Sequence, residues 1–443
     1  MLNILKEQIK DKNVLILGYG REGHSTLHRV LEVGGFSSVT VADKNQVQLP
    51  APAKALCGEH YMDTLDDYDL IFKSPGVVLP KDPEQYNCRF TSQMEVFFEA
   101  YRDRIIGITG TKGKSTTTTL LYHILKKSGL DTVLSGNIGI PAFDILEEIH
   151  PDTQLVCELS CHQLEYIHVS PHIGVLLNIH EEHLDHYGTM EKYIHAKQQI
   201  YLHQLPQDLL FCGMDVTPAD DTCRSRIFTV SDQNFDADVL LGGTKIHFDG
   251  HSYQIPSDRI PLLGHHNHID IAFVYAICRT LGLNDTQIEN GLISYEPLPH
   301  RLRLVGEKDG IRFYDDSIST ICDTTIQALK SVSSVGSVLI GGMDRGIDYQ
   351  DLISYLSVDP VPHIILMAAT GKRIYEEIHA SYPDFHQPER LHLVDTLEEA
   401  VAFAKEVTPA GYACVLSPAA ASYGIFKNFE ERGDVFTKLA LEK

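Results

Sequence analysis

Short apolar runs, separated by segments in which apolar residues recur at helical spacing, divide the chain into three α/β blocks. In the first block, apolar runs at 13–17, 39–43 and 70–73 each lead into a turn rich in glycine, acid or proline. Runs of this length, bounded by turn residues and separated by helices, predict parallel strands that are buried on both faces. This block closes near 97–104.

The second block opens with an apolar strand end and a glycine-rich turn, after which leucine and isoleucine recur at helical spacing and predict a helix over 115–127. Short apolar strands at 154–158 and 173–177 end in polar residues. A stretch at 209–256 contains Gly-Gly and Asp-Gly turns, which predict antiparallel additions to the sheet. A further helix is predicted over 269–283.

Two prolines in the segment 297–301 mark a linker before the third block. Strands and helices then alternate, and alternation of this kind predicts another parallel, doubly wound sheet. The predicted elements are a strand at 311–314, a helix at 322–330, and strands at 337–342, 363–368 and 413–417. We therefore expect an α/β protein of three domains, at 1–97, 98–300 and 301–443, each built on a mostly parallel sheet.

The turn of the second block carries the most specific chemical signal. The sequence Gly107-Ile-Thr-Gly-Thr-Lys-Gly-Lys-Ser-Thr116 lies between a strand and a helix, where backbone N–H groups and the helix dipole favour a phosphate. Lys114 is expected to reach the terminal phosphates of a nucleotide, and the Ser115 hydroxyl to bind Mg²⁺. The common P-loop pattern would have glycine at position 108, where this chain has Ile108. The predicted ATP-binding residues of this loop are Gly110, Thr111, Gly113, Lys114, Ser115 and Thr116.

A second glycine-rich turn, Gly18-Tyr-Gly20-Arg-Glu-Gly23, follows the first strand, and Asp43 ends the second strand. By itself this G-x-G-x-x-G spacing indicates a dinucleotide site, as in an NAD-dependent oxidoreductase. The spacing is weak evidence, and the loop at 107–116 already accounts for one nucleotide. We expect a second nucleotide-like site here, and these residues leave its ligand open.

The polar segment at 178–186 holds His180, His183 and His186, with acids between them. It allows three interpretations: a transition-metal site, a hard-cation site in which Glu158 and His183 lie beside nucleotide phosphates, and a solvated helix start. The phosphate loop favours Mg²⁺, which takes few protein ligands and uses phosphate oxygens for the rest.

Charge and composition exclude several classes of protein. Sixty acidic and 37 basic residues give a net charge of −23, which is a poor match for duplex nucleic acid or an anionic membrane. No apolar run has the length of a membrane span, and the N-terminal residues lack the pattern of a signal peptide. Nine cysteines without paired spacing suit a reducing compartment. We expect a monomeric cytoplasmic protein that binds no nucleic acid and does not insert into membranes.

Many separated motifs resemble, in the same order, those of the Mur ligase family. Besides the phosphate loop, the matching segments are 135–141, 158–165, 177–201, 264–267, 299–301, 316–317, 341–342 and 416–433. The resemblance covers essentially the whole chain. It implies a P-loop ATPase domain between two Rossmann-like domains: UDP-sugar binding at 1–97, ATP binding at 98–300 and amino-acid binding at 301–443.

The resemblance further implies an ATP-dependent ligase of peptidoglycan precursor synthesis that adds D-glutamate to UDP-N-acetylmuramoyl-L-alanine through an acyl phosphate. For ATP it implies the phosphate loop with Asn267, Arg301 and Asp316. For the UDP substrate it implies Gly18, Tyr19, Gly20, Arg21, Asp43, Lys44, Ser74, Gly76 and Asn137. For glutamate it implies Thr320, Arg345, Ser422 and Phe429. For two Mg²⁺ sites it implies Ser115, Glu158, His183 and a carbamylated Lys197; the residues expected to carry the chemistry are Lys114, Glu158, His183 and Lys197.

The third block departs from the family pattern where glutamate is expected to bind. Ile318 stands where a lysine is common, and Arg345 replaces a lysine that often follows the paired glycines. The sequence Asp316-Ser-Ile-Ser-Thr320 also resembles a branch of the family that adds L-glutamate, so the same ligase with L-glutamate is one alternative. A ligase like folylpolyglutamate synthase is another, although that family lacks the N-terminal block in this form.

Overall fold

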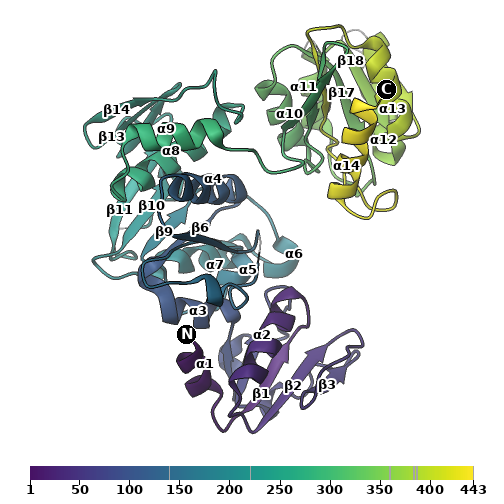
Figure 1. Ribbon diagram of the computed structural model, residues 1–443. Helices are drawn as coiled ribbons and strands as arrows, with labels where there is room; N and C mark the ends of the chain where they lie inside the picture. The colour runs from purple at the N-terminus through teal and green to yellow at the C-terminus, as the bar shows by residue number, and fades with distance from the viewer. Residues whose placement is uncertain (139, 220, 359–360, 383–384, 386–387, 443) are drawn as a thin grey trace. The chain divides into compact units, whose positions relative to one another are not determined.

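The computed structural model describes residues 1–138, 140–219, 221–358, 361–382, 385 and 388–442. Within these residues the strands form three sheets, and the chain divides into two compact units (Figure 1). Unit 1 comprises Met1–Pro256 and Ile269–Ser294, and unit 2 comprises Ser257–His268 and Tyr295–Lys443. In the described part of the chain, no helix combines the length and the apolar character that crossing a membrane requires.

The first sheet lies in unit 1 and is entirely parallel. In spatial order its strands are β3 (Lys54–Cys57), β2 (Ser38–Asp43), β1 (Asn13–Leu17), β4 (Leu70–Lys73) and β5 (Arg89–Thr91). Apolar residues of β1 and β2 pack with those of three helices, α1 (Leu2–Ile9), α2 (Arg21–Val33) and α3 (Gln93–Tyr101). Because β1 pairs with both β2 and β4, the turns that follow these three strands meet at one edge of the sheet.

The second sheet, also in unit 1, has nine strands. Their spatial order is β14 (His251–Gln254), β13 (Lys245–Phe248), β12 (Val239–Gly242), β11 (Arg226–Ser231), β10 (Leu209–Gly213), β9 (Ile173–Leu176), β6 (Ile105–Thr109), β8 (Gln154–Glu158) and β7 (Thr132–Gly136). The antiparallel additions predicted over 209–256 occur only at β12–β13 and β13–β14. For β10 and β11 that prediction was wrong, because both strands extend the parallel sheet.

Strand β6 occupies the middle of the parallel part, between β8 and β9, and all five of its residues are buried. The helices of this region are α4 (Lys114–Lys127), α5 (Cys161–Leu164), α6 (Leu184–Tyr187), α7 (Met190–Leu202), α8 (His265–Thr280) and α9 (Asp285–Ser294). Helix α8 begins at His265, four residues before the start predicted from apolar spacing, directly after Gly264 with its positive φ of 89°. Helix α4 agrees with the prediction to within one residue.

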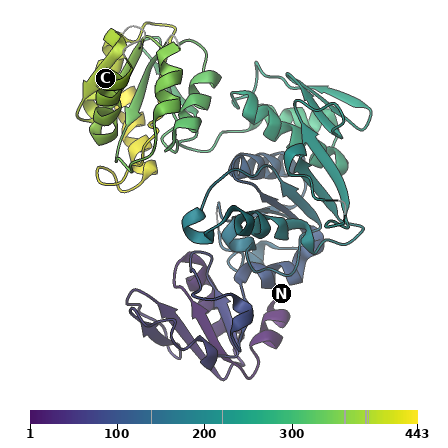
Figure 2. The same cartoon turned by 180° about the vertical axis from the view of Figure 1, so that it is seen from behind.

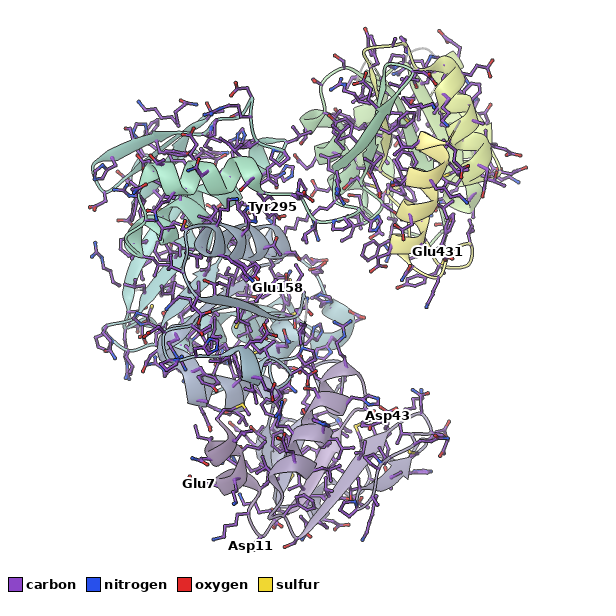
Figure 3. The ribbon with its side chains drawn as sticks, viewed as in Figure 1. Glu7, Asp11, Asp43, Glu158, Tyr295 and Glu431 are labelled. Carbon is purple, nitrogen blue, oxygen red and sulfur yellow. The ribbon has the colours of Figure 1, made fainter. Side chains whose placement is uncertain are left out.

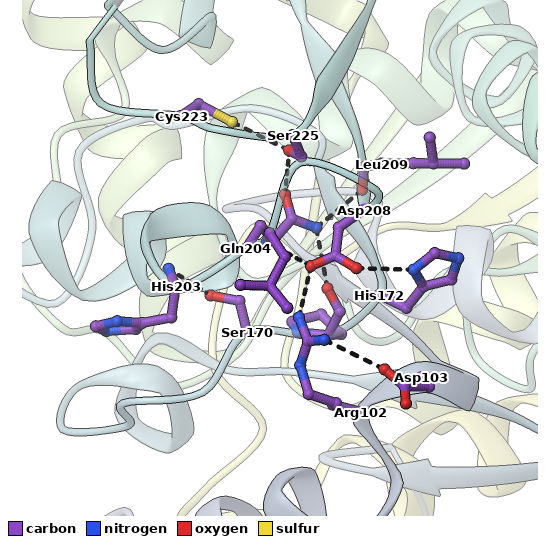
Figure 4. Close-up of polar contacts among 12 residues, drawn as sticks. Arg102, Asp103, Ser170, His172, His203, Gln204, Asp208, Leu209, Cys223 and Ser225 are labelled. Carbon is purple, nitrogen blue, oxygen red and sulfur yellow. Dashed lines mark hydrogen bonds and ion pairs between the residues drawn. The ribbon is translucent and has the colours of Figure 1, made fainter.

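A buried polar network fixes the amino ends of the parallel strands, at the edge opposite the phosphate loop (Figure 4). The side chain of Asp208, which directly precedes β10, accepts hydrogen bonds from Arg102 Nη2 and from the backbone N–H of Leu205, and pairs with His172 Nδ1 at 2.8 Å. Nearby, Gln204 Nε2 donates to two backbone carbonyls. The network satisfies polar groups that would otherwise be buried at a high cost in free energy.

The third sheet lies in unit 2. Its strands, in spatial order, are β15 (Arg303–Lys308), β16 (Ile311–Asp315), β20 (Ala413–Leu416), β17 (Val335–Gly341), β18 (His363–Met367) and β19 (Leu391–Val394). All neighbours are parallel except the edge pair β15–β16.

Alternate residues of β17 point to opposite faces of this sheet, as strand geometry requires. Val338 and Ile340 pack in a cluster with α10 (Cys322–Ser331), α11 (Gln350–Val358) and α12 (Ala368–Ser381). Leu339 packs in a second cluster with α13 (Leu397–Val407) and α14 (Phe429–Leu441), and Figure 2 gives the opposite view of the unit. The sheet is therefore doubly wound, and the predicted fold class, α/β with three mostly parallel sheets, is confirmed.

Candidate active site

The predicted phosphate loop lies between β6 and α4, at the carboxyl edge of the second sheet. Gly113 has a positive φ of 82°, and a Cβ there would lie 2.5 Å from Asp270 Oδ1, so the turn requires glycine. The hydroxyl groups of Thr111 and Tyr193 lie 2.9 Å apart in a buried contact. The loop is therefore fixed both by its own backbone and by a side chain of α7.

Asn178, which follows β9, clamps the same loop from the neighbouring strand. Its Oδ1 accepts the backbone N–H groups of Thr111 (3.1 Å) and Lys112 (2.9 Å), and its Nδ2 donates to the carbonyl of Lys112 (3.1 Å). This role of Asn178 was not predicted from the sequence. Its position directly after an apolar run beside the phosphate-loop strand was the available signal.

Two lysines converge on the loop from different helices. Lys114 begins α4, and its Nζ donates to the carbonyls of Gly110 (2.9 Å) and Thr111 (2.8 Å). Lys197, buried within α7, donates to the same Gly110 carbonyl (2.7 Å) and lies over the ring of Tyr193. Burial, reinforced by the positive charge of Lys114, lowers the pKa of Lys197 to about 8. The loop thus gathers two amines, one of which loses its proton unusually easily.

Glu158 ends β8, next to β6, and its side chain is buried (Figure 3). Its Oε1 accepts a hydrogen bond from Asn137 Nδ2 (2.8 Å), whereas its Oε2 has no hydrogen-bond partner among the described residues. The backbone holds this pair in place, because Asn137 N–H donates to the Glu158 carbonyl (2.9 Å), and a Cβ at Gly136 would lie 2.1 Å from that carbonyl oxygen. A buried carboxylate with one unpartnered oxygen is a suitable ligand for a cation.

His183 precedes α6 and has a left-handed backbone with φ of 57°. Its ring lies 4.9 Å from that of His162, centroid to centroid, and its Nε2 lies 3.7 Å from Glu182 Oε2. Burial, followed by the charges of His186 and His183, lowers the pKa of His162 to about 4, so the His162 ring is neutral at pH 7.

These groups surround one pocket of about 350 Å³. It is lined by Pro75, Gly76, Lys114, Asn137, Ser160, Cys161, His162, Glu182, His183 and Lys197. Three of the four residues expected to carry the chemistry therefore line it, and the fourth, Glu158, is hydrogen-bonded to the lining residue Asn137. Ser115 and Thr116 lie in the first turn of α4. A second hollow, of about 480 Å³ near residues 231–236, contains none of these groups.

The residues predicted for the UDP substrate gather at the carboxyl edge of the first sheet. Tyr19 N–H donates to Asp43 Oδ2 (2.7 Å), and the Ser74 hydroxyl donates to the Gly18 carbonyl (2.8 Å). A Cβ at Gly23 would lie 2.1 Å from the Gly18 oxygen, so only glycine allows α2 to start this close to the turn. The loops after β1, β2 and β4 are thereby joined.

The remaining members of that set lie on the same loops, except Asn137, which follows β7 of the second sheet. Gly20 and Arg21 stand at the start of α2, Lys44 follows β2, and Gly76 lines the pocket described above. Gln163 Nε2 donates to Glu22 Oε1 (2.6 Å), which links α2 to the short helix that follows β8.

In unit 2, Asp316 follows β16 and is buried. Its Oδ1 accepts the Leu302 N–H (3.1 Å) and its Oδ2 accepts the Ser417 hydroxyl (2.8 Å). Burial raises the pKa of Asp316 to about 7, against the lowering effect of these bonds and of Arg301. Arg301 Nε is buried without a hydrogen-bond partner among the described residues. Asn267 lies in the first turn of α8.

The residues predicted for glutamate lie on loops at the carboxyl edge of the third sheet. Arg345 Nη2 donates to the Thr320 carbonyl (3.0 Å), and an antiparallel bridge joins the loop of Arg345 to the residue before Ser422. Phe429 begins α14, and its carbonyl accepts the Ser317 hydroxyl (2.8 Å).

Buried Arg432 holds two of these loops together, a role that was not predicted from the sequence. Its Nε donates to Ser317 Oγ (3.0 Å), its Nη2 to the Ser317 carbonyl (2.7 Å) and its Nη1 to the Ala420 carbonyl (3.0 Å). The contacts join segments more than a hundred residues apart, which the local sequence does not reveal.

Comparison with known proteins identifies relatives of the whole chain. The Mur ligase middle domain matches residues 108–278. The UDP-N-acetylmuramoylalanine–D-glutamate ligase of Geobacillus kaustophilus is 35% identical over 96% of each chain, and that of Bacillus subtilis is 31% identical over 97% of each. Among solved structures, MurF of Acinetobacter baumannii aligns with a TM-score of 0.62 and 18% identity over 99% of this chain and 92% of the other, which supports the fold. Since two such ligases match the chain from end to end, it belongs to the Mur ligase family, in the group whose members are named UDP-N-acetylmuramoylalanine–D-glutamate ligases.

Proposed function

We propose that the chain is an ATP-dependent amide ligase that adds D-glutamate to UDP-N-acetylmuramoyl-L-alanine in peptidoglycan precursor synthesis. The observation that carries this proposal is the convergence of Lys114, His183 and Lys197 on one pocket, with Glu158 fixed behind it, in a member of the Mur ligase family. The D enantiomer is proposed because the relatives are named for it.

The reaction brings two anions together. In the proposed sequence, a carboxylate oxygen of the UDP-linked substrate attacks the γ-phosphorus of ATP, and ADP leaves. The amine of glutamate then attacks the carbonyl carbon of the acyl phosphate, loses a proton, and the tetrahedral intermediate expels phosphate. The phosphate keeps the oxygen that came from the carboxylate. Lys114 lies at the start of α4 beside the loop, where an ammonium group offsets the charge on the transferred phosphoryl group.

The donor set fits a magnesium-dependent step. The unpartnered Oε2 of Glu158 and the ring of His183 are available to a hard cation, together with the Ser115 hydroxyl. Bound magnesium supplies positive charge beside the phosphates. As an ammonium, Lys197 has no lone pair for a metal. Its lowered pKa supports the proposal that its neutral amine adds to CO₂, with loss of one proton, to form a carbamate that completes the second site.

We propose that each of the three sheets belongs to a segment that binds one substrate. Residues 1–97 would bind the UDP-sugar, 98–300 ATP, and 301–443 glutamate. In the last segment, the Arg345 guanidinium offers the fork geometry that suits a side-chain carboxylate, next to Thr320. Asn267, Arg301 and Asp316 are proposed ATP contacts. The proposed setting is a cytoplasmic monomer.

Phosphate release by purified protein tests this function. ATP, Mg²⁺ and UDP-N-acetylmuramoyl-L-alanine are combined with either enantiomer of glutamate, and each component is omitted in turn. The proposal predicts turnover that requires all components and the D enantiomer. Turnover with L-glutamate but not with D-glutamate would establish the alternative ligase. Phosphate release that does not need the UDP substrate would contradict the D-glutamate ligase and the L-glutamate ligase alike. Lys114→Ala serves as the inactive reference.

A further inference from the structure

Three side chains with soft or borderline donor atoms converge beside the phosphate loop. The Sγ of Cys161 and ring nitrogens of His162 and His183 all lie within 4.8 Å of one another. Cys161 and His162 open α5, and His183 precedes α6, so two separate segments supply the donors. The spacing of histidines along the sequence groups His183 with His180. In the fold, Cys161 and His162 are instead the neighbours of His183.

The spacing of one pair of these donor atoms matches a tetrahedral site. Cys161 Sγ lies 3.6 Å from His162 Nδ1. Zinc–sulfur and zinc–nitrogen bonds of about 2.3 and 2.05 Å at a tetrahedral angle place the two donor atoms about 3.6 Å apart. The rings of His162 and His183 meet edge to face, with an interplanar angle of 74°. The sulfur and one imidazole nitrogen thus already have the separation that a shared zinc ion requires.

The donor chemistry favours a different metal from the one proposed for catalysis. Magnesium prefers oxygen ligands, whereas a thiolate with two imidazoles selects zinc-like ions. All three residues line the pocket, so an ion can reach them from solvent, and a fourth coordination position remains for water. Glu182, whose Oε2 lies 3.7 Å from His183 Nε2, adds negative charge that offsets the nearby lysines.

Neighbouring side chains support the imidazoles. The ring of His186 lies 4.4 Å from that of His162, and its Nε2 contacts Glu165 Oε2 at 3.3 Å. The contact with Glu165 holds the His186 ring, which in turn packs against the ring of His162. The cluster therefore has donors, an entry route and a polar surrounding.

We propose that Cys161, His162 and His183 form a binding site for a zinc-class divalent ion, and that its occupation inhibits the ligase. The inhibitory part rests on the proposed function, because His183 cannot bind zinc in this cluster and also serve the magnesium site. The binding part is independent of turnover.

Cobalt(II) is the probe for the site itself. The full-length protein is titrated with Co²⁺ in the absence of nucleotide, and the sulfur-to-cobalt charge-transfer absorption is recorded for wild type, Cys161→Ser, His162→Asn and the control Cys88→Ser. Cys88 is a partly buried cysteine that directly precedes β5 of the first sheet. Zinc affinity is measured in parallel by competition with a chromogenic chelator, and circular dichroism verifies that each variant is folded.

The proposal predicts a charge-transfer band in wild type and Cys88→Ser that is absent in Cys161→Ser. It also predicts zinc binding weakened at least about tenfold in Cys161→Ser and His162→Asn. A band that persists in Cys161→Ser, or equal zinc affinity in all four proteins, would overturn the site.

The second part is tested by zinc titration of phosphate release at saturating Mg²⁺, with each variant compared with its own rate without zinc. The inhibitory role is supported if zinc inhibits the wild type and if Cys161→Ser requires at least about tenfold more zinc for the same inhibition. Equal inhibition of both would refute it. The cobalt spectra decide the metal site even if neither enantiomer of glutamate is a substrate.

Discussion

Lys114 and Lys197 donate hydrogen bonds to a single oxygen atom, the carbonyl of Gly110, at 2.9 and 2.7 Å. Two ammonium groups this close repel each other, and the buried one is favoured to lose its proton. The same backbone atom thus couples the lysine proposed to face a phosphate to the lysine proposed to accept CO₂.

Substitution of Lys197 by alanine is expected to lower kcat/KM at least about 100-fold, because a metal-binding carbamate cannot form. The matched control is Lys192→Ala on the same helix, whose side chain is 65% exposed and which should retain full activity. A short carboxylate added to Lys197→Ala should restore part of the rate. Incubation of wild type with carbon-labelled bicarbonate should give a carbamate carbon signal by NMR that Lys197→Ala lacks. Near-normal turnover of Lys197→Ala would refute the second-metal assignment.

Asn137 donates the hydrogen bond that orients Glu158. Asn137→Ala should lower kcat/KM by about 10- to 100-fold and raise the Mg²⁺ concentration required for half-maximal rate, since an unoriented carboxylate binds the ion less well. A magnesium titration of phosphate release measures both effects. The exposed Asn87 supplies a control substitution to alanine. A lower rate with an unchanged magnesium requirement would argue that Asn137 acts on the substrate alone.

Asp208 at the opposite edge of the sheet should matter for stability and not for catalysis. Its side chain is fully buried beside Arg102, so Asp208→Ala should destabilise the second sheet by about 3 kcal/mol, since it leaves a partly buried cation without its partner. The control is Asp103→Ala, because Asp103 also contacts Arg102 but its side chain is 84% exposed. This substitution should lower the free energy of unfolding by at most about 0.5 kcal/mol. Hydrogen exchange of β9 and β10 amides under urea compares the two, and equal protection would contradict the network's role.

The contact between His300 and Asp315, 2.7 Å from Nδ1 to Oδ2, raises the pKa of the His300 imidazole, chiefly through this hydrogen bond. A raised pKa means that the folded state holds the proton more tightly than the unfolded state. The contact therefore stabilises unit 2 fully below the unfolded pKa of about 6.5, and this contribution is lost as pH rises through the folded value. NMR titration of His300 should show a pKa above its ordinary value in wild type and a lower one in Asp315→Asn. The same pKa in both proteins would refute the pairing.

Much of this architecture follows from local patterns. The phosphate loop, the glycine turn after β1 and the polar ends of β8 and β9 all lie within a few residues of the strands that position them. Parallel strands bring their carboxyl ends to one edge, so the positions of Glu158 at a strand end and Lys114 just after another already predict that both lie at that edge. The fold class, and the grouping of these residues at one edge of the sheet, were predictable for this reason.

The polar segment at 178–186 was not predictable in the same way. Its histidines have helical spacing, but the helix there is only Leu184–Tyr187, and the residue before it has a left-handed backbone. The backbone N–H of His180 instead donates to the Thr111 hydroxyl (2.9 Å), which takes His180 into a loop contact. Cys161 and His162 become the neighbours of His183 through tertiary packing.

Long-range clamps were equally hidden from the sequence. Asn178 contacts a loop 66 positions earlier in the chain, and Arg432 contacts Ser317 across 115 positions. Each acts by satisfying backbone groups of another segment. The apolar run before Asn178 indicates only that it lies at a strand end, and the residues around Arg432 do not indicate its contact with Ser317.

The fate of one carboxylate oxygen shows whether the reaction passes through an acyl phosphate. UDP-N-acetylmuramoyl-L-alanine with isotopically labelled oxygen in its carboxylate is turned over with ATP and D-glutamate, and the released phosphate is analysed by mass spectrometry. If the carboxylate is activated as an acyl phosphate, each phosphate carries one labelled oxygen and the amide product retains the other. Unlabelled phosphate would contradict the proposed chemistry of this site.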